Sequence, residues 1–526
     1  MRHAWLVVLA IGCGDGGETN DGLTVAIDSG TIHGVDQGAT RAFLGVPYAA
    51  PPVGALRWKR PQPVAPWDRL ETIATGIQCP QAFSLAGPGG DEDCLTLNVW
   101  APAGATVKDL PVMVWFHGGA FVFGSGGDAY YNGSHLAETY GVVVVTVNYR
   151  LGAFGFLAHP ALAAEDPAYP SSGNYGLEDQ FAALGWVQRN IAAFGGDPAR
   201  VLMFGESAGG YSACVHYVAP RTQGLFAWAI SQSGLCSSNV LEPSRADAEA
   251  AGIAVAEGRL GCTGAGALAC LRGKSTEQLL DATKLPPASE QPPGGFVYSS
   301  ALATLPNVDG VVIPKPLREL FAEGNYDKRP LLLGTNRDEG TLFHSSFFAT
   351  EVTGEPELRA ALAQRFAPAQ VDAIVARYPI ASFPSANAAI AKVTGDAFFV
   401  CPARRTARAA SAAGAHVYRY SFEQEPGQAF LGGLGVFHSA ELPFVFGTDP
   451  AYPLARVGEA GQPVAGALQR YWTRFAAAGD PNGPIGNGDP PWPAYSAAGD
   501  RHLTFATPIT SESGLAADAC DFWDAL

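Results

Sequence analysis

The sequence predicts an α/β protein built on one large, mixed and mostly parallel β-sheet. Short apolar runs that are typical of buried strands alternate with longer segments whose apolar residues recur at helical spacing. Residues 142–147 are the clearest strand, because every residue in them is β-branched. Strands of this kind are covered on both faces, so helices are expected on both sides of the sheet.

Eight segments have the pattern of strands or hairpins. Residues 23–35 alternate between apolar and polar residues except at Ser29-Gly30, which predicts a leading hairpin. Residues 41–61 are irregular and rich in proline, and no strand is assigned to them. The other strands are short apolar runs, predicted at residues 95–100, 111–116, 142–147, 201–204, 227–231, 330–334 and 416–422.

Helices are predicted between these strands. Residues 177–194 have apolar side chains at helical spacing and end at a Gly-Gly-Asp-Pro run, which stops a helix. Residues 208–218 are compatible with a helix that follows the 201–204 strand directly. A long, mostly helical region is expected after the 227–231 strand, up to about residue 326.

The composition indicates a folded, acidic protein. Hydrophobic residues make up 47% of the 526 residues and charged residues 16%, which is enough for a large core. The net charge of −16 gives no electrostatic reason to bind nucleic acid or anionic lipid. No internal repeat is evident, and large α/β enzymes reach this length, so residues 23–526 are expected to form a single domain.

The first twelve residues are predicted to be a signal peptide. Arg2 provides a small positive region, and residues 5–11 form an apolar stretch too short to span a bilayer. The run that ends at Cys13 resembles a bacterial lipoprotein signal, in which Cys13 is lipidated after cleavage, and residues 13–22 form a flexible polar tether. An ordinary secretory signal is the alternative. The protein is therefore expected to be exported, as a cell-envelope lipoprotein (periplasmic or at the cell surface) or secreted, with Cys13 as its only membrane attachment.

Ser207 lies at a sharp turn between a predicted strand and a predicted helix. Residues 205–209 read G-x-S-x-G, and such a turn holds the serine in a strained conformation with its hydroxyl at the edge of the sheet. The helix that starts just after it directs free backbone N–H groups toward the same place. An ordinary glycine-rich turn is the alternative, because glycine makes up 63 of the 526 residues. A base and a carboxylate elsewhere in the chain are needed to distinguish a nucleophile from an ordinary turn.

A serine hydroxyl needs a base beside it, and the base needs a carboxylate that orients it. In α/β-hydrolases these groups follow in the order Ser, acid, His. The strand at residues 330–334 is followed by Asp338 and Glu339, and their spacing allows either as the acid. A solvated charged turn is the alternative for both residues.

His438 is the favoured base among the four histidines after the acid. It follows the 416–422 strand in a glycine-rich loop that is able to reach across the carboxyl edge of a sheet. His344 follows the acid too closely, and His416 has the position of a strand residue. His502 lies near the end of the chain beside Arg501.

An oxyanion hole is expected in the loop at residues 117–120, which reads HGGA and follows the 111–116 strand. Its glycines allow backbone N–H groups to approach a substrate oxygen closely. Ala208, directly after Ser207, would supply a further N–H group. A simple tight turn is the alternative for this loop.

Taken together, these motifs resemble the type-B carboxylesterases, the cholinesterase/carboxylesterase/lipase family of α/β-hydrolases. Residues 92–100, EDCLTLNVW, fit one family signature fully. Residues 194–209 fit a second signature except at Met203, where the family prefers Val, Leu or Ile. Residues 43–54 are similar to the N-terminal pattern of the family. The resemblance extends from about residue 23 to the C-terminus.

The resemblance implies the α/β-hydrolase fold and a role for each matching residue. It implies Glu339 as the acid of the triad and His438 as the base. It places the oxyanion N–H groups on Gly119, Ala120 and Ala208, with Gly118 in the same loop. Glu206 and Ser233 match family positions next to the triad that are thought to tune the histidine.

The resemblance also implies three disulfides, which an exported chain can form. Cys79–Cys94 and Cys401–Cys520 match the family well, and Cys262–Cys270 matches with a shorter loop than usual. Cys214 and Cys236 are not family standards, so a fourth bridge and two inert buried thiols both remain open. No Cys or Cys/His group has the spacing of metal ligands, so zinc is not expected.

The activity implied by the resemblance is that of a serine carboxylesterase, which cleaves small-molecule esters through an acyl-enzyme on Ser207 without a metal or redox cofactor. A lipase of the same fold is an alternative. A non-catalytic adhesion module is disfavoured, because such modules have lost a triad residue. Choline specialists have a tryptophan in the loop that corresponds to Cys79–Cys94, where Phe83 is the only aromatic residue here. The Gly-Gly-Ala-Phe loop is typical of esterases that tolerate bulky alcohols.

Overall fold

The computed structural model describes residues 22–83, 87–104, 107–238, 242–284, 301–344, 350–429, 432–449, 451–483 and 488–526. The predicted signal peptide at residues 1–12, the predicted lipidation site Cys13 and the rest of the tether as far as residue 21 lie outside the described residues. All other predicted site residues lie within them.

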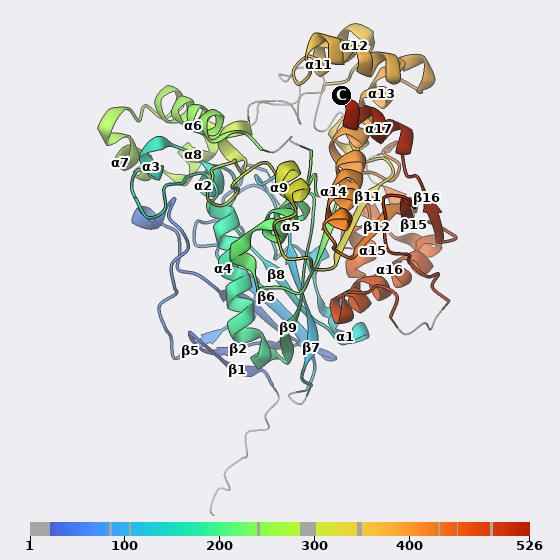
Figure 1. The fold of residues 1–526 in the computed structure, drawn as a ribbon. Helices are drawn as coiled ribbons and strands as arrows, with labels where there is room; N and C mark the ends of the chain where they lie inside the picture. The colour runs from blue at the N-terminus through green and yellow to red at the C-terminus, as the bar shows by residue number, and fades with distance from the viewer. Residues whose placement is uncertain are drawn as a thin grey trace, which may run out of the picture.

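An eleven-stranded β-sheet forms the centre of the described part of the chain (Figure 1). Its strands are β3 (Val35–Asp36), β4 (Thr40–Pro47), β6 (Thr96–Pro102), β7 (Leu110–Phe116), β8 (Val143–Val147), β9 (Gly196–Glu206), β10 (Trp228–Gln232), β11 (Leu331–Asn336), β12 (Val417–Phe422), β15 (Arg501–Phe505) and β16 (Thr510–Ser513). The middle strands pair parallel in the order β8-β7-β9-β10-β11-β12-β15, and the outer strands pair antiparallel. The predicted mixed, mostly parallel sheet is confirmed.

Helices cover both faces of the sheet, and successive residues of one strand point into two different cores. In β7, Val112 and Val114 belong to one hydrophobic core, whereas Met113 and Trp115 belong to the other. This explains why the strand is apolar at nearly every position. The first core packs against α4 (Tyr175–Asn190), α5 (Ala208–Val218) and α14 (Cys401–Ala412), and the second against α1 (Ser134–Tyr140), α15 (Leu442–Phe446) and α16 (Gly458–Ala478).

Two groups of helices lie beyond the carboxyl ends of the parallel strands (Figure 1). The group coloured cyan to green contains α2 (Gly152–Phe156), α3 (Pro160–Ala163), α6 (Arg245–Ile253), α7 (Ala267–Arg272) and α8 (Thr276–Thr283). The group coloured orange to red contains α11 (Glu355–Leu362), α12 (Pro368–Arg377), α13 (Ala386–Gly395) and α17 (Ala517–Ala525). Helix α9 (Leu317–Glu323) packs against α5 and α14.

The N-terminal segment differs in part from the expectation. The leading hairpin is confirmed as β1 (Thr24–Ile27) and β2 (Gly30–His33), and β2 also pairs with β5 (Arg69–Glu71) to form a separate three-stranded sheet. Strand β4, however, lies mostly within residues 41–61, where the sequence pattern predicts no strand. Its pairing with β6 is interrupted by a register shift at Gly45, whose φ of 70° breaks the alternation that identifies a strand.

Four disulfides cross-link the described residues: Cys79–Cys94, Cys214–Cys236, Cys262–Cys270 and Cys401–Cys520. Cys214 and Cys236 thus form a fourth bridge in the structure and are not two separate buried thiols. Stable disulfides form in oxidising compartments, which indicates an exported protein. Within the described residues, no helix combines the length and apolar character needed to cross a bilayer.

The crossing of α5 over the end of β7 leaves no room for a side chain at Gly209. A Cβ there would lie 1.9 Å from the carbonyl oxygen of Phe116, which is backbone and unable to move aside. We expect Gly209→Ala to lower the free energy of unfolding by about 3 kcal/mol, measured by urea denaturation. Gly258→Ala is the control, because no atom lies within 4 Å of its added Cβ. Equal stability of the two variants would contradict this account of the crossing.

Candidate active site

Ser207 occupies the turn between β9 and α5 with a φ of 56° and a ψ of −119°. Non-glycine residues rarely adopt positive φ, so the surrounding contacts must hold this conformation. The backbone N–H of Ser207 donates to the carbonyl of Gln232 at 2.9 Å, which fixes the turn to the end of β10. A Cβ on Gly205 would lie 2.5 Å from the carbonyl of Gly209, so the turn closes only with glycine there.

His438 and Glu339 meet behind this turn. The imidazole Nδ1 lies 2.6 Å from Glu339 Oε2 in a hydrogen bond, and both side chains are buried. The other carboxylate oxygen, Oε1, accepts hydrogen bonds from the hydroxyl of Ser233 at 2.5 Å and from the N–H of Asn336 at 2.7 Å. Three donors therefore hold the Glu339 side chain in one orientation.

Asp338, the other acid that spacing allowed, points elsewhere. Its carboxylate accepts a hydrogen bond from the N–H of Val436 at 2.8 Å and pairs with Arg337. The N–H of Asp338 in turn donates to the carbonyl of Val436. Asp338 thus holds the segment that leads to His438, and its neighbour Glu339 contacts the imidazole.

A second carboxylate lies on the opposite side of the imidazole. Glu206 Oε1 is 3.1 Å from the Nε2 of His438, and Glu206 is 3% exposed. Neither of these two atoms has a hydrogen-bond partner among the described residues. The rings of Phe343 and Phe399 contact the imidazole, with centroids 5.0 and 4.9 Å away. The Nε2 of His438 is thus buried, faces the Glu206 carboxylate and makes no hydrogen bond within the described residues.

The buried charges set the protonation of this site. Burial lowers the pKa of His438, but Glu206 and Glu339 outweigh it and raise that pKa to about 9. For Glu206 the effect of burial has the opposite sign: it raises the pKa of this carboxyl to about 8, although the attraction of the imidazole opposes the shift. Both groups, which lie 3.1 Å apart, therefore hold a proton more tightly than they would in water.

Sequence reasoning did not identify two polar neighbours of the site, Asn336 and Glu441. The Asn336 side chain donates to Glu441 at 2.6 Å and to the carbonyl of Phe437 at 2.8 Å. Gln232 donates to the other oxygen of Glu441 at 3.0 Å. The position of Glu441, three residues after His438, was the signal that could have drawn attention to it.

The loop after β7 lies beside Ser207 and exposes backbone N–H groups. Gly119 has a φ of 106° and Ala120 a φ of 51°, which bends the loop back on itself. The N–H groups of Gly119, Ala120 and Ala208 donate to no acceptor among the described residues. A Cβ on Gly118 would lie 3.1 Å from the Cβ of Ser207, so this glycine allows the two turns to touch.

Contacts from several elements hold this loop in place. The side chain of Gln81, two residues after Cys79, exchanges hydrogen bonds with the N–H and carbonyl of Gly124 at 2.8 and 3.1 Å. The hydroxyl of Tyr149 donates to the carbonyl of His117 at 2.7 Å, and the two rings stack at 4.4 Å. The first disulfide loop therefore supports the loop that carries the free N–H groups.

Ser207 and His438 line the same pocket, whose walls are mainly aromatic and aliphatic. Phe83 and Phe123 pack edge to face in one wall at 5.2 Å. The other residues that line the pocket are Gly118, Gly119, Ala120, Gly124, Tyr130, Tyr131, Glu206, Leu342, Phe343, Ser439, Leu442, Tyr452 and Leu454. No group of three or more His, Cys, Asp or Glu side chains in the described ranges could hold a metal ion.

Comparisons with known proteins agree with this arrangement. Residues 21–523 match the model of the carboxylesterase family. The chain is 37% identical to the para-nitrobenzyl esterase of Bacillus subtilis (strain 168), covering 93% of this chain and 96% of that protein. It is 36% identical to the fumonisin B1 esterase of Sphingopyxis macrogoltabida, covering 93% of this chain and 87% of that protein.

A more distant relative and a solved structure extend the comparison. The acetylcholinesterase of Bungarus fasciatus is 31% identical over 95% of this chain and 86% of its own length. A solved structure of PNB esterase superposes with a TM-score of 0.82 at 34% identity, covering 95% of this chain and all of that one. The fold is therefore that of the α/β-hydrolases, as predicted. The chain belongs to the carboxylesterase family and is a carboxylic ester hydrolase.

Proposed function

We propose that this protein cleaves carboxylic esters through an acyl-enzyme on Ser207, with His438 as general base and Glu339 as the carboxylate that orients it. One observation carries the proposal: His438 is bonded through Nδ1 to Glu339 and lines the same pocket as Ser207. A buried imidazole fixed at one nitrogen leaves the other available to take a proton.

In the first step, the Ser207 oxygen attacks the ester carbonyl carbon while its proton passes to the Nε2 of His438. The carbonyl oxygen becomes negatively charged, and the N–H groups of Gly119, Ala120 and Ala208 stabilise it in the oxyanion hole. The C–O bond of the ester then breaks, and the alcohol leaves with the proton from His438. The acyl group remains on Ser207.

In the second step, water repeats the attack on the acyl carbon. His438 accepts a proton from the water and returns it to the oxygen of Ser207 as the acid leaves. Glu339 keeps the imidazole in the required tautomer, and Glu206 adds a second negative charge close to the imidazolium. Each group is used twice, and the resting state is restored.

The pocket supports an ester of moderate size with an apolar or aromatic alcohol group. Phe83 and Phe123 offer an aromatic wall, and the Gly-Gly-Ala-Phe loop leaves backbone rather than side chains near Ser207. Two relatives are named as esterases of para-nitrobenzyl and fumonisin B1 compounds. Phe83 lies in the disulfide loop in which choline specialists have a tryptophan, so choline esters are not proposed as the substrate.

We also propose that residues 1–12 are a lipoprotein signal and that residues 13–22 tether the single enzyme domain of residues 23–526 to a lipid on Cys13. Mass spectrometry of the mature N-terminus tests this proposal. We expect a first residue Cys13 that carries a diacylglycerol, and loss of membrane association in Cys13→Ala. An unmodified N-terminus at another position would instead indicate an ordinary secretory signal.

Replacing the proposed nucleophile should abolish turnover. We expect Ser207→Ala to lower kcat for p-nitrophenyl acetate by about 10⁴-fold or more and to prevent labelling by an organophosphate. Ser382→Ala, at an exposed position on the 3₁₀ helix Ile380–Ser382, is the control and should keep both. Labelling of Ser207→Ala at the wild-type rate would mean that the nucleophile is another residue.

Removing the charge of Glu206 should change the pH dependence of the reaction. Its carboxylate favours the protonated imidazole, so Glu206→Gln lowers the pKa of His438 and leaves more neutral base at a given pH. We expect the acid limb of kcat/KM to move to lower pH by about one unit. Glu277→Gln, exposed on α8, should leave the limb in place. A shift to higher pH would overturn this account of the buried charges.

A further inference from the structure

The disulfide Cys214–Cys236 connects the helix after the Ser207 turn to the segment that follows β10. Cys214 lies in α5, and Cys236 lies in residues 233–237, which we call the β10 loop. Both cysteines are buried, at 0% and 3% exposed. The bridge therefore joins α5, which follows β9, to the β10 loop, which follows the neighbouring strand β10.

The β10 loop has a strained backbone that needs support. Ser233 has a φ of 50° and Leu235 a φ of 53°, and neither is glycine. Strained conformations persist only where the surroundings hold them. Between them, Gly234 packs tightly on α5, because a Cβ there would lie 2.6 Å from the backbone carbon of Gly210. Ser231 at the end of β10 adds a hydrogen bond to the carbonyl of Gly210 at 2.9 Å.

Two of the groups that contact the base, Glu339 and Phe399, pack against this loop. Ser233 donates its hydroxyl proton to Glu339 Oε1 at 2.5 Å. Leu235 packs in one cluster with Phe399, whose ring is 4.9 Å from that of His438. A displacement of the β10 loop therefore moves the carboxylate on one side of His438 and the aromatic ring on another.

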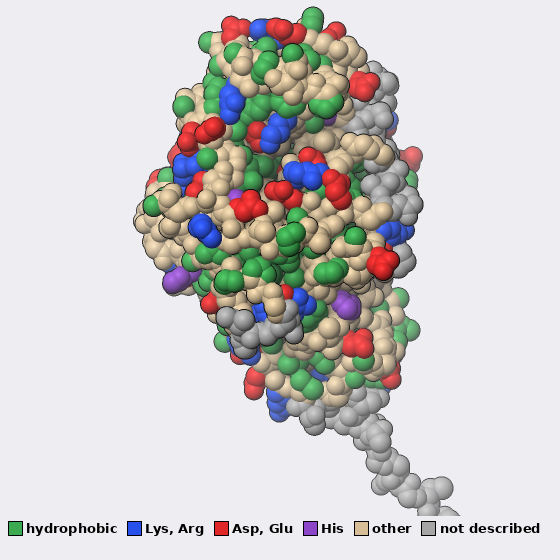
Figure 2. Space-filling view, turned by 90° about the vertical axis from the view of Figure 1, so that its right-hand side faces the viewer, with side chains coloured by type: hydrophobic (Ala, Val, Ile, Leu, Met, Phe, Trp, Pro, Cys, Tyr) green, Lys and Arg blue, Asp and Glu red, His purple; other side chains and the backbone are tan. Residues whose placement is uncertain are grey.

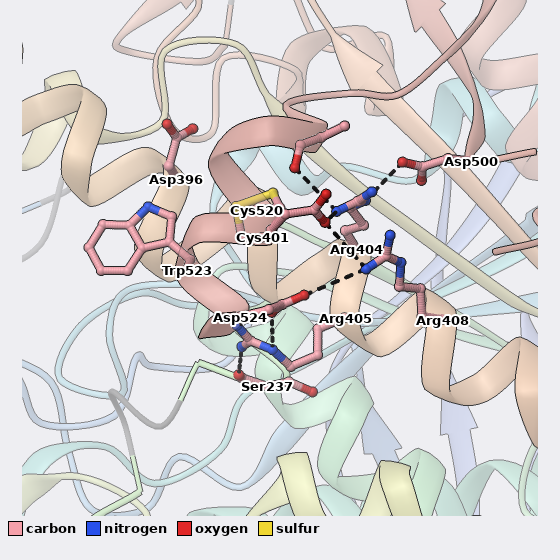
Figure 3. The surroundings of a disulfide bond; sticks show 12 residues. Ser237, Asp396, Cys401, Arg404, Arg405, Arg408, Asp500, Cys520, Trp523 and Asp524 are labelled. Atoms are coloured by element: carbon pink, nitrogen blue, oxygen red, sulfur yellow. Dashed lines mark hydrogen bonds and ion pairs between the residues drawn. A yellow bond between two sulfur atoms is a disulfide. The ribbon is translucent and has the colours of Figure 1, made fainter. Parts of the chain in front are cut away.

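The far end of the loop is held from α14 (Figure 3). Arg405 donates to the carbonyl of Ser237 at 2.7 Å and pairs with Asp524 of α17 at 2.6 Å. The hydroxyls of Ser237 and Thr406 are hydrogen-bonded at 2.7 Å. Figure 3 also shows the disulfide Cys401–Cys520, which joins α14 to α17. On the side of α5, the covalent connection is Cys214–Cys236.

We propose that Cys214–Cys236 is a positioning disulfide, which keeps the β10 loop in the strained form that orients Glu339 and His438. The proposal rests on the roles given above to these two residues and to Ser207. Without the bridge, the loop relaxes toward ordinary backbone angles and the Ser233 hydroxyl leaves Glu339. No residue of the loop lines the substrate pocket among the described residues. The defect should therefore appear in kcat and leave KM nearly unchanged.

The test compares three variants with a matched control: Cys214→Ala/Cys236→Ala, Ser233→Ala, their combination, and Cys262→Ala/Cys270→Ala. We expect the first two each to lower kcat by about tenfold, since a small misplacement of a catalytic group has effects of this size. Because the bridge acts through Ser233, the combination should lower kcat little further. The control removes a disulfide whose cysteines pack in a different core cluster, so it should lower the melting temperature and keep kcat.

Activity is expressed per active site, titrated with an organophosphate, so that misfolded protein does not count. If the alanine pair does not fold, Cys214→Val/Cys236→Ala keeps more of the buried volume and serves the same comparison. A wild-type kcat in the folded variant that lacks Cys214–Cys236, or effects that multiply when Ser233→Ala is added to it, would overturn the proposal. The proposed function is tested separately by Ser207→Ala. If that variant is inactive, the proposed function stands even where the disulfide proposal fails. If that variant keeps its activity, the proposed function itself is refuted.

Discussion

The hydrogen bond between His438 and Glu339 requires segments from distant parts of the chain to meet at one buried point. The sheet makes this meeting possible. Glu339 follows β11, Ser233 follows β10, Ser207 follows β9, and the loop at residues 117–120 follows β7. These four strands are parallel neighbours, so their carboxyl ends lie side by side. His438 alone is delivered by a longer loop after β12, which Asp338 fastens to the sheet.

Close packing at this edge depends on residues without side chains. Gly205 and Gly209 let α5 start against β7, and Gly210 and Gly234 let α5 touch the end of β10. Any Cβ at these positions would meet backbone atoms, which cannot rotate away. The same closeness brings the turn at Ser207 and the start of α5 against the loop at residues 117–120. The glycines thus connect the packing of the fold with the electrostatics proposed for the site.

The sequence revealed those parts of the site that depend on local order. The turn at Ser207 could be predicted because strand, glycines and helix are contiguous in the chain. Spacing left Asp338 and Glu339 equivalent, since adjacent residues of a turn point in different directions and only the folded loop decides which one meets the imidazole. Cys214 and Cys236 remained ambiguous for a similar reason, because pairing depends on distances in space. Phe399 gave no signal, as its contact with His438 crosses two elements.

Three glutamates are buried close to the imidazole of His438, and hydrogen bonds hold two of them, Glu339 and Glu441. Glu206, Glu339 and Glu441 are at most 3% exposed, and like charges in such a site oppose one another. Burial and Glu339 raise the pKa of Glu441, against hydrogen bonds from Asn336 and Gln232 that lower it. Buried like charges of this kind cost folding stability, yet they raise the pKa of His438 and so favour the imidazolium that the proposed mechanism requires. The like charges are useful only if the carboxylates cannot turn toward solvent or shed their charge by moving. Ser233, Asn336 and Gln232 meet that requirement for Glu339 and Glu441, and each of the three lies within or directly after a strand of the sheet.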